Sequence, residues 1–541
     1  MIGFRSLNRR RQVTLRLTSR LAIAVVVALL STIARAEPLG PFAGPSWIRK
    51  LFPEREVTPP LQTFLLFPNY RGMMFCDQSQ IARVAINVNP PAAATMAQLR
   101  VALDVIDAGE KVLLTHRLSP AKGASVATID MRSLPLGRYR LQGYLEDAGG
   151  KRIFTPPSYT IVKVGSEVRA EMKAWIDSDN VFHMGGRPRF VIGLYDTTGS
   201  SLQPGYYAER LQEIAKAPIN LMINYFLATA DTDVLDAYTE AMAPFGIIYL
   251  DTVSAFFPEM RAYPPSARAQ HLDADELIAR HAKALRGNSR VVGYYTCDEC
   301  ASEVQQRTFH QYALIKQDDP GSITFAVENY SNEFQFWRDS VDVLGVDPYV
   351  LGTRHDESYV GDMTRKAVEA LQGARPVWTV IQFFRQSSFS HFPSEQELHD
   401  MSWMAITEGA RGVFYWSYGI RGLEWGKPDP VLRQHRYDEL VHVTRGVSAL
   451  EPVLLAPDSP VLSGNSAVGN VITKEKDLRG GTRYLISYNH SGNTIDAGFT
   501  LNRPARAVSV YGENRSIALD HGGSKFRDTY APFQAHVYKI D

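Results

Sequence analysis

The residues best suited to chemistry are two adjacent carboxylates, Asp298 and Glu299, which end the apolar run VVGYYTCDEC (residues 291–300). A short apolar run of this kind is typical of a buried β-strand, so the pair lies where a strand becomes a loop. A positioned carboxylic acid can protonate a poor leaving oxygen, and a second carboxylate can act as a nucleophile or a base. The pair therefore predicts acid–base catalysis and favours glycosidic bond cleavage.

The elements that must position this pair repeat along the chain. Eight apolar runs predict buried parallel strands at Phe190–Tyr195, Ile219–Tyr225, Ile247–Val253, Val291–Cys297, Ile323–Glu328, Val341–Val346, Val377–Phe383 and Val413–Ser417. Helical patterns follow at Tyr206–Lys216, Val234–Ala243, Ala274–Leu285, Ser302–Lys316, Tyr359–Leu371, Glu395–Glu408 and Val431–Val447. The fifth connection, around Asn332–Asp339, is short. This alternation predicts a (β/α)8 TIM barrel over residues 180–450, whose chemistry belongs at the carboxyl ends of the strands.

Smaller β-domains are expected on both sides of the barrel. Residues 57–167 alternate apolar and polar positions between turn signals, as in Leu99–Val105, and predict an immunoglobulin-like β-sandwich. The alternation returns over residues 455–541, which predicts a C-terminal β-sandwich.

Two segments carry a resemblance to a known group of enzymes. NVFHMGGRPRFVIGLYD (residues 180–196) resembles the turn and first strand that open many secreted glycosidase barrels. ARPVWTVIQFF (residues 374–384) and FPSEQELHDMSWMAITEGARGVFYWSYG (residues 392–419) resemble the seventh and eighth strands of the same group. The resemblance, to the large clan of retaining glycosidases, implies a barrel that acts on carbohydrate.

This resemblance also suggests roles for individual residues. Glu299 matches the fourth-strand acid/base of the clan, whereas Asp298 stands where an Asn is common. The seventh strand ends in Gln382, in the place of the nucleophilic Glu, so the second carboxylate stays open. Asp298 could orient an acetamido group, as in substrate-assisted hexosaminidases. Asp347, at the end of the sixth strand, and Glu328, at the end of the fifth, are the other candidates.

A carbohydrate site also needs aromatic faces for stacking and amides for hydrogen bonds to hydroxyl groups. The alternative for each candidate is ordinary packing or backbone hydrogen bonding at the barrel rim. The candidates at or beyond strand ends are Tyr225, Tyr349, Trp416 and Tyr418 among the aromatic residues, and Asn224, Asn329 and Gln382 among the amides.

The three cysteines give little support to metal or redox chemistry. Cys297 and Cys300 flank the acid pair as a CxxC motif, and Cys76 is far away in the sequence. No second CxxC or histidine cluster accompanies them. A local disulfide that braces the acid loop and plain buried thiols are both compatible with the motif. We expect no metal and no cofactor.

The N-terminus predicts export. Six arginines between Arg5 and Arg20 precede the apolar run Leu21–Ile33, and Ala34-Arg35-Ala36 is a small-x-small cleavage site. Residues 1–36 are therefore expected to be a signal peptide, and no other segment is expected to cross a membrane. The formal net charge of +1 gives no support to nucleic-acid binding.

Together these features predict a periplasmic, cell-surface or extracellular glycoside hydrolase that cleaves a poly- or oligosaccharide. The first alternative is a non-catalytic carbohydrate-binding or polysaccharide-assembly protein, favoured by the absent seventh-strand Glu. A lyase on the same barrel is another, because a fold does not determine a function. Separations between carboxyl groups of about 5–5.5 Å would favour retention, and about 6.5–9.5 Å inversion. The sequence does not determine the sugar, the linkage or the oligomeric state.

Overall fold

The structure is a computed structural model that describes residues 59–90, 95–119, 124–198, 204–225, 227, 232–254, 256, 264–300, 305–386, 390–478 and 480–541. The expected signal peptide, residues 1–36, lies outside the described residues. Within the described ranges, no helix combines the length and the hydrophobicity that a membrane crossing needs.

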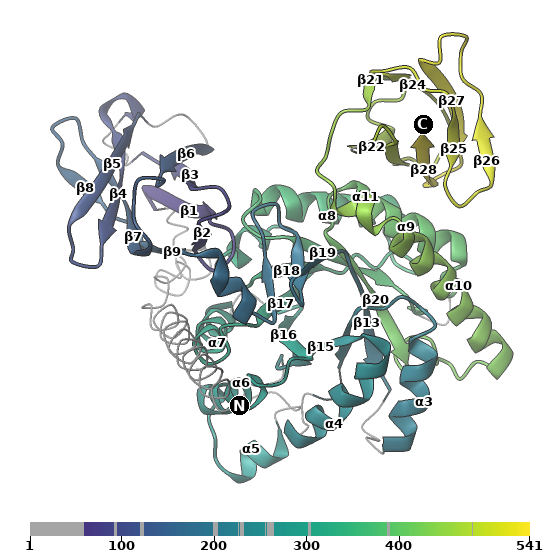
Figure 1. Ribbon diagram of the computed structural model, residues 1–541, viewed down its shortest axis with the longest axis horizontal. Coiled ribbons are helices and arrows are strands. Elements are labelled where there is room, and N and C mark those ends of the chain that lie inside the picture. Colours follow the sequence, from purple (N-terminus) through teal and green to yellow (C-terminus); the bar gives the residue numbers. More distant parts are fainter. Residues whose placement is uncertain are drawn as a thin grey trace, which may run out of the picture.

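A closed barrel of eight parallel strands forms the centre of the molecule (Figure 1). Its strands pair in chain order, and the last pairs with the first. They are β13 (Val191–Thr197), β14 (Leu221–Asn224), β15 (Ile248–Thr252), β16 (Val291–Asp298), β17 (Ile323–Glu328), β18 (Val343–Val346), β19 (Val377–Gln382) and β20 (Gly412–Gly419). The predicted eight-stranded parallel barrel is therefore confirmed.

The strands are apolar throughout because both of their faces are covered. One face fills the barrel interior with large side chains such as Leu250, Phe325, Trp378 and Phe414, all essentially inaccessible to solvent. The residues between them pack outward against the helices, as Tyr249 does. This two-residue alternation decides which polar residues at the strand ends enter the mouth of the barrel.

Helices cover the outside of the barrel. They are α3 (Pro204–Ile214), α4 (Thr232–Met242), α5 (Pro265–Ala269), α6 (Ala274–Leu285), α7 (Gln305–Asp318), α8 (Ser358–Leu371), α9 (Glu395–Thr407), α10 (Pro430–Ala449) and α11 (Glu451–Leu455). The fifth connection holds only the short 3-10 helix η6 (Phe334–Trp337). Local sequence sets several starts: Ser394 and Glu397 form a capping box for α9, and Asp429 caps α10 ahead of Pro430.

Two antiparallel-rich sheets precede the barrel and share one hydrophobic core. The smaller contains β1 (Leu61–Phe67), β3 (Ile81–Val88) and β6 (Ala124–Asp130). The larger contains β2 (Met73–Phe75), β9 (Tyr159–Val164), β7 (Gly137–Glu146), β4 (Arg100–Asp107), β5 (Val112–Leu118) and β8 (Arg152–Phe154). A three-stranded sheet of β10 (Ala174–Ile176), β11 (Phe182–Met184) and β12 (Arg187–Arg189) then packs on the amino-terminal end of the barrel core.

A buried ion pair joins the first sheets to the barrel. Arg71 lies between β1 and β2, and its Nη2 is 2.8 Å from Oδ2 of Asp342, just before β18. Both side chains are almost wholly buried, and Arg71 also donates to the carbonyl oxygens of Pro320 and Ser322. Because Asp342 precedes its strand, this contact lies at the amino-terminal end of the barrel, away from the carboxyl ends.

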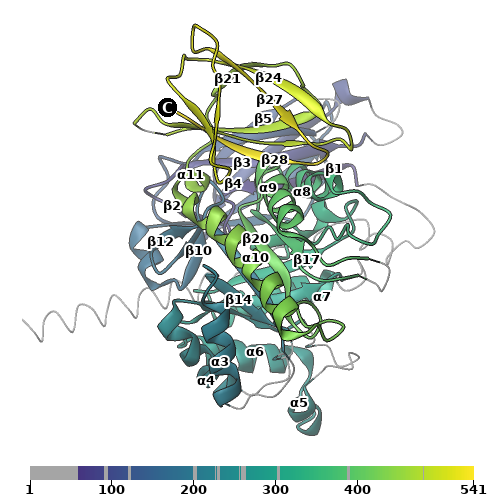
Figure 2. The ribbon, with the colours of Figure 1, turned by 90° about the vertical axis from the view of Figure 1, so that its right-hand side faces the viewer.

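Two further antiparallel sheets follow the barrel and have a core of their own. They contain β21 (Leu462–Asn465), β24 (Ile495–Leu501) and β27 (Lys525–Tyr530), and β22 (Val471–Asp477), β23 (Arg483–Asn489), β28 (Ala535–Ile540), β25 (Val508–Val510) and β26 (Arg515–Ile517). Figure 2 shows these yellow strands next to α8 and α9. The Tyr488 hydroxyl donates to Glu408 at 2.7 Å, directly after α9.

Candidate active site

A bulge at the end of β16 decides where the first acid points. The register with β17 shifts between Tyr295 and Cys297, so that Tyr295 and Asp298, three residues apart, both enter the barrel mouth. Glu299 then leaves the strand with a φ of +47°, although its N–H still donates to the Val327 carbonyl at 2.9 Å. The turn is what allows two adjacent acids to lie near the same mouth.

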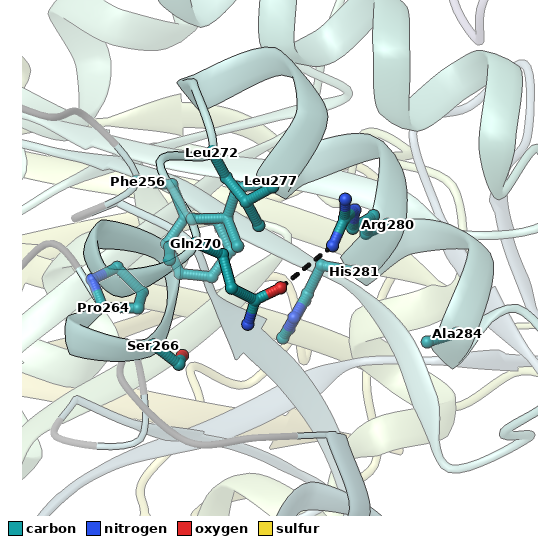
Figure 3. Close-up of a pocket in the computed structure, with 10 residues that line it drawn as sticks. Phe256, Pro264, Ser266, Gln270, Leu272, Leu277, Arg280, His281 and Ala284 are labelled. Atoms are coloured by element: carbon teal, nitrogen blue, oxygen red, sulfur yellow. Dashed lines mark hydrogen bonds between the residues drawn. The ribbon is translucent and has the colours of Figure 1, made fainter.

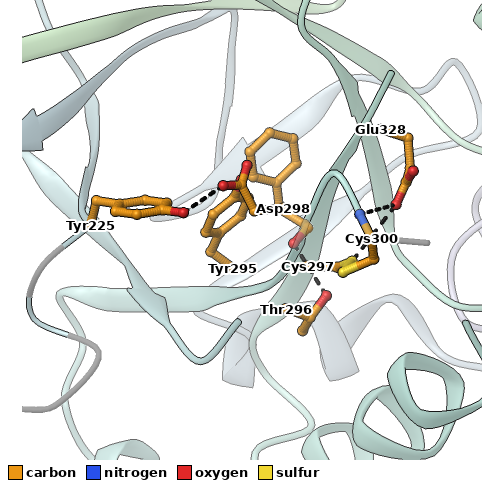
Figure 4. The surroundings of a disulfide bond; sticks show 8 residues. Tyr225, Tyr295, Thr296, Cys297, Asp298, Cys300 and Glu328 are labelled. Atoms are coloured by element: carbon orange, nitrogen blue, oxygen red, sulfur yellow. Dashed lines mark hydrogen bonds between the residues drawn. A yellow bond between two sulfur atoms is a disulfide. The ribbon is translucent and has the colours of Figure 1, made fainter. Parts of the chain in front are cut away.

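Two tyrosines hold the Asp298 carboxylate. The Tyr225 hydroxyl donates to its Oδ2 at 2.6 Å, and the Tyr295 hydroxyl donates to its Oδ1 (Figure 4). Burial raises the pKa of Asp298 above its usual value, and both phenol hydrogen bonds oppose that rise because they stabilise the carboxylate. Asp298 thus has a fixed orientation, with each oxygen engaged.

The second acid of the mouth is Asp347, directly after β18. Its side chain is buried and makes a hydrogen bond with the more exposed Glu299 carboxyl group. Burial raises the pKa of Asp347 well above its usual range, and the nearby charge of Glu299 and their hydrogen bond raise it further. Asp298 acts in the same direction. The raised pKa favours the protonated form of Asp347, which can donate a hydrogen bond to the Glu299 carboxyl group.

This contact defines what the pair can do chemically. Two carboxyl groups joined by a hydrogen bond cannot both ionise easily, so they share one proton and supply one acid and one carboxylate.

Aromatic side chains line the same mouth. Trp416, on β20, is half-buried and packs edge to face on Tyr225, with ring centroids 5.0 Å apart, and on Tyr195 at 4.9 Å. Tyr349, two residues after Asp347, packs on Phe384 at 4.9 Å. The partly exposed rings of Trp416, Tyr225 and Tyr349 offer apolar faces beside the acids, as a sugar site requires.

Glu328 does not lie with the other acids. Because Val327 fills the barrel interior, the next residue along β17 points to the opposite face. Its Oε1 accepts a hydrogen bond at 3.2 Å from the N–H of Cys300, the residue after Glu299 in the sequence (Figure 4). Glu328 therefore lies on the opposite face of β17 from the acids of the mouth.

Strand alternation also removes two predicted sugar contacts. Asn224 follows the interior residue Ile223, so its amide points outward and donates to Asp196 at 3.2 Å. The Tyr418 ring packs outward against α10, and its hydroxyl donates to Glu213 of α3. Both side chains belong to the layer between strands and helices.

The Gln382 side chain does enter the mouth, but its amide group is hydrogen-bonded to backbone groups of the same chain. Its Oε1 accepts from the N–H groups of Val350 and Leu351, both at 2.9 Å. Its Nε2 donates to the carbonyl oxygens of Leu351 and Phe384. These four bonds use both lone pairs and both hydrogens, so the side chain holds the loop after Asp347 and has no capacity left for a sugar. Asn329, by contrast, has a buried Oδ1 with no partner among the described residues.

Two residues of the mouth are absent from the sequence predictions. Tyr295 holds Asp298, and Tyr195 packs on Trp416, yet both lie inside apolar runs that look like plain core. Tyrosine in a buried strand was the available signal, because a buried hydroxyl needs a polar partner. The bulge that brings Tyr295 to Asp298 leaves no local signature.

The cysteines next to the site form a disulfide between Cys297 and Cys300, and Cys76 is free and exposed. The Cys297, Cys300 and Glu328 ligand atoms lie within 4.8 Å of one another, a spacing that a metal ion would tolerate. The two sulfurs are bonded to each other, however, and cannot serve as thiolate ligands in this state.

A separate hollow of about 210 Å³ lies outside the barrel, against α5 and α6 (Figure 3). Arg280 donates to the Gln270 side chain across it at 3.2 Å, and His281 bonds Asp251 of β15. Asp251 follows the interior residue Leu250 and so points away from the mouth. The hollow therefore contributes nothing to the acid cluster.

The fold and its mouth define a closed TIM-barrel protein with acids at the carboxyl ends of its strands. No family model matches the sequence. No curated protein matches it. Similar solved structures include a family 5 glycoside hydrolase from Bacteroides vulgatus, with 12% identity, 68% of this chain and 94% of that chain covered, and a TM-score of 0.48.

Two further similar structures cover more of the chain. A family 39 glycoside hydrolase from Bacteroides cellulosilyticus has 12% identity, with 86% of this chain and 97% of that chain covered and a TM-score of 0.42. A putative alpha-galactosidase from Bacteroides fragilis has 10% identity, with 90% and 99% covered and a TM-score of 0.43. At these values the likeness says nothing about the activity or substrate of this chain.

Proposed function

We propose that the protein is a glycoside hydrolase that cleaves O-glycosidic bonds in a poly- or oligosaccharide. The observation that carries this proposal is the hydrogen-bonded pair of Glu299 and Asp347 at the carboxyl ends of a closed barrel. Such a pair can share one proton and so supply one acid and one carboxylate, which are the two groups that glycosidic cleavage requires.

The raised pKa of Asp347, the more buried partner, favours the proton on that residue in the resting pair. Transfer of this proton along the hydrogen bond makes Glu299 the acid and leaves Asp347 ionised. Glu299, exposed at the mouth, then protonates the leaving oxygen as the glycosidic bond breaks. Asp347 either takes a proton from the water that attacks the anomeric carbon, or bonds to that carbon itself until water displaces it. No proton enters or leaves the pair until the bond breaks, so the resting arrangement already holds the correct charge.

The remaining mouth residues support this reaction. Asp298, held by Tyr225 and Tyr295, places a negative charge near the position where the sugar would develop positive charge. Trp416 offers a stacking face next to Tyr225. Asn329 has a free acceptor among the described contacts and suits a sugar hydroxyl.

The test is hydrolysis by the purified mature protein. Aryl glycosides with good and poor leaving groups, and a panel of polysaccharides, are incubated with the wild type and with Glu299→Gln. New reducing ends that appear with the wild type and not with the folded variant support the proposal. Equal release by both proteins would exclude Glu299 as the acid.

A second candidate is a non-catalytic carbohydrate-binding or polysaccharide-assembly protein. Gln382 favours it, because the seventh strand supplies no carboxylate and the amide is committed to the loop backbone. This candidate predicts that Glu299→Gln binds oligosaccharide as tightly as the wild type while neither protein releases reducing ends. Calorimetric titration beside the hydrolysis assay separates the two.

Export and the domain division are part of the same proposal. The arginine-rich leader and Ala34-Arg35-Ala36 support removal of residues 1–36, and the flanking sheets fit an immunoglobulin-like β-sandwich before the barrel and a β-sandwich after it. Mass spectrometry of the secreted protein should find an N-terminus near Glu37. Recovery of only full-length protein in the cytoplasm would contradict export.

A further inference from the structure

The turn that carries Glu299 is closed from behind by two constraints. The Cys297–Cys300 disulfide links the residues on either side of it. Glu328, on the neighbouring strand β17, accepts the Cys300 N–H at 3.2 Å, and its Oε1 lies 3.7 Å from Sγ of Cys297 (Figure 4). Both ends of the turn are therefore tied to the barrel wall, while Glu299 projects towards the mouth.

Glu328 is an unusual residue to find in this place. Its side chain is fully buried, and its Oε2 has no hydrogen-bond partner among the described residues. Its neighbour Cys297 belongs to a buried apolar cluster that includes Phe334, Trp337 and Met363. The Cys300 N–H is the one hydrogen-bond donor to the Glu328 carboxyl group among the described backbone contacts, and a buried ionised carboxylate generally requires more hydrogen bonds or an opposite charge.

The acids around Glu328 oppose its ionisation as well. Burial raises its pKa to about 9, and repulsion from Glu333, Asp298 and Glu299 adds to the rise, whereas the Cys300 N–H opposes it. The charge of Glu328 also acts on Asp347, directly after β18, and raises its pKa. Tyr359 of α8 packs against the apolar cluster that contains Cys297. The disulfide sulfurs do not titrate.

We propose that Glu328, in its neutral form, and the Cys297–Cys300 disulfide together position Glu299 for proton transfer. This inference rests on the proposed glycoside hydrolase function and extends it to the control of the acid turn. Neutral Glu328 accepts the Cys300 N–H without adding charge. Once ionised, Glu328 becomes a further negative group beside Asp298 and Glu299. The turn and these two acids then lose their geometry.

The sharpest test compares three side chains in pH profiles of kcat. Gln at position 328 keeps the acceptor oxygen and cannot ionise. The kcat of Glu328→Gln should therefore match that of the wild type within about twofold at neutral pH. Its alkaline loss of activity should occur at a pH at least about one unit higher than in the wild type. Glu333→Gln removes a repelling charge and should bring the alkaline loss to lower pH. Glu328→Ala removes the acceptor and should lower kcat at all pH values with little change in KM.

Two outcomes would overturn the role of Glu328. One is a Glu328→Gln variant as inactive at neutral pH as Glu299→Gln, which would make Glu328 a catalytic acid. The other is an alkaline loss of activity at the same pH in the wild type and in Glu328→Gln.

The disulfide is tested in a Cys76→Ser background, which removes the free thiol. Alkylation should label no cysteine before treatment with a dithiol reductant and both Cys297 and Cys300 after it. Reduction should lower kcat about tenfold or more while KM changes little, because a small misplacement of an acid is costly. Full activity of the reduced, alkylated protein would overturn this part.

A readout without substrate keeps this inference separate from the proposed function. Infrared difference spectra between neutral and alkaline pH should contain the loss of a buried protonated carboxyl band that is missing in Glu328→Gln. If the band is present and no glycoside is cleaved, the proposed function fails and the neutral Glu328 stands. If hydrolysis occurs and the band is identical in both proteins, the inference fails alone.

Discussion

Asp347 and Glu299 are joined by a side-chain hydrogen bond although the strand β17 lies between the two strands that carry them. Asp347 is the first residue after β18, and its side chain continues the interior side of that strand. Glu299 reaches it from the turn after β16. The barrel thus brings two acids that are 48 positions apart in the sequence (347 − 299) into one proton-sharing pair.

Removal of either acid of the pair should disable the reaction. Glu299→Gln and Asp347→Asn keep the shape of each side chain, but neither amide can exchange the shared proton, so we expect kcat to fall by about 10²–10⁴-fold. Steady-state kinetics on a glycoside with a poor leaving group measures this, and circular dichroism checks folding. Added azide should restore part of the activity of Asp347→Asn, and a covalent sugar trapped on β19 would contradict the assignment.

Asp347 should also make the stability of the fold depend on pH. Its folded pKa is raised by burial, whereas an unfolded carboxyl group titrates near about 4. The folded state therefore binds more protons above this pH, and its free energy of unfolding decreases as pH rises towards the raised pKa. Asp347→Asn lacks this loss, so the difference between its melting temperature and that of the wild type should grow in favour of the variant as pH rises above about 4.

Thermal unfolding of both proteins across this range is the measurement. Asp400→Asn, at a buried acid in α9 that is outside the mouth, is the matched control. A pH-independent difference between wild type and Asp347→Asn would mean that Asp347 ionises normally in the folded state.

The two tyrosines that hold Asp298 should act through its orientation and charge. Tyr225→Phe and Tyr295→Phe each remove one hydrogen bond that stabilises the carboxylate, so the pKa of Asp298 should rise further and the acidic side of the kcat/KM profile should move to higher pH. Tyr415→Phe, whose hydroxyl contacts Ser402 outside the barrel, is the control and should leave the profile unchanged. Identical profiles for all variants would separate Asp298 from the reaction.

Asp298 also allows a direct test of substrate assistance. If it orients an acetamido group, Asp298→Asn should cripple hydrolysis of N-acetylated substrates more than that of other glycosides, and an oxazoline-like inhibitor should bind the wild type. The engagement of both its oxygens by tyrosine leads us to expect an equal loss on both substrate types. Paired substrates that differ only in the acetamido group provide the measurement.

Introduction of a glutamate at the end of the seventh strand should not create a nucleophile. Gln382→Glu loses the two donors that reach the carbonyl oxygens of Leu351 and Phe384. We expect a loss of about 1–3 kcal/mol in the free energy of unfolding and no gain in activity. Urea unfolding and initial rates test both parts, and a rise in kcat would show that the loop backbone can release this side chain.

The sequence by itself determined the number, the order and the approximate ends of the barrel elements. Apolar runs and helical periodicity are local signals, and eight apolar runs that alternate mostly with helices are typical of a closed parallel barrel. The predicted ends of β17, Ile323 to Glu328, coincide with those in the structure, and α6 spans Ala274–Leu285 as predicted. The position of Asp298 and Glu299 at the end of the fourth strand followed from the same signals.

Only the tertiary structure decided which polar residues meet. Glu328, Asn224 and Tyr418 end strands as Asp347 does, but the alternation of each strand, set by its register with its neighbours, turns them away from the mouth. The bulge in β16 adds a residue and brings Tyr295 to the same side as Asp298. Register and bulges depend on pairing between strands that are distant in sequence, so a local pattern cannot contain them.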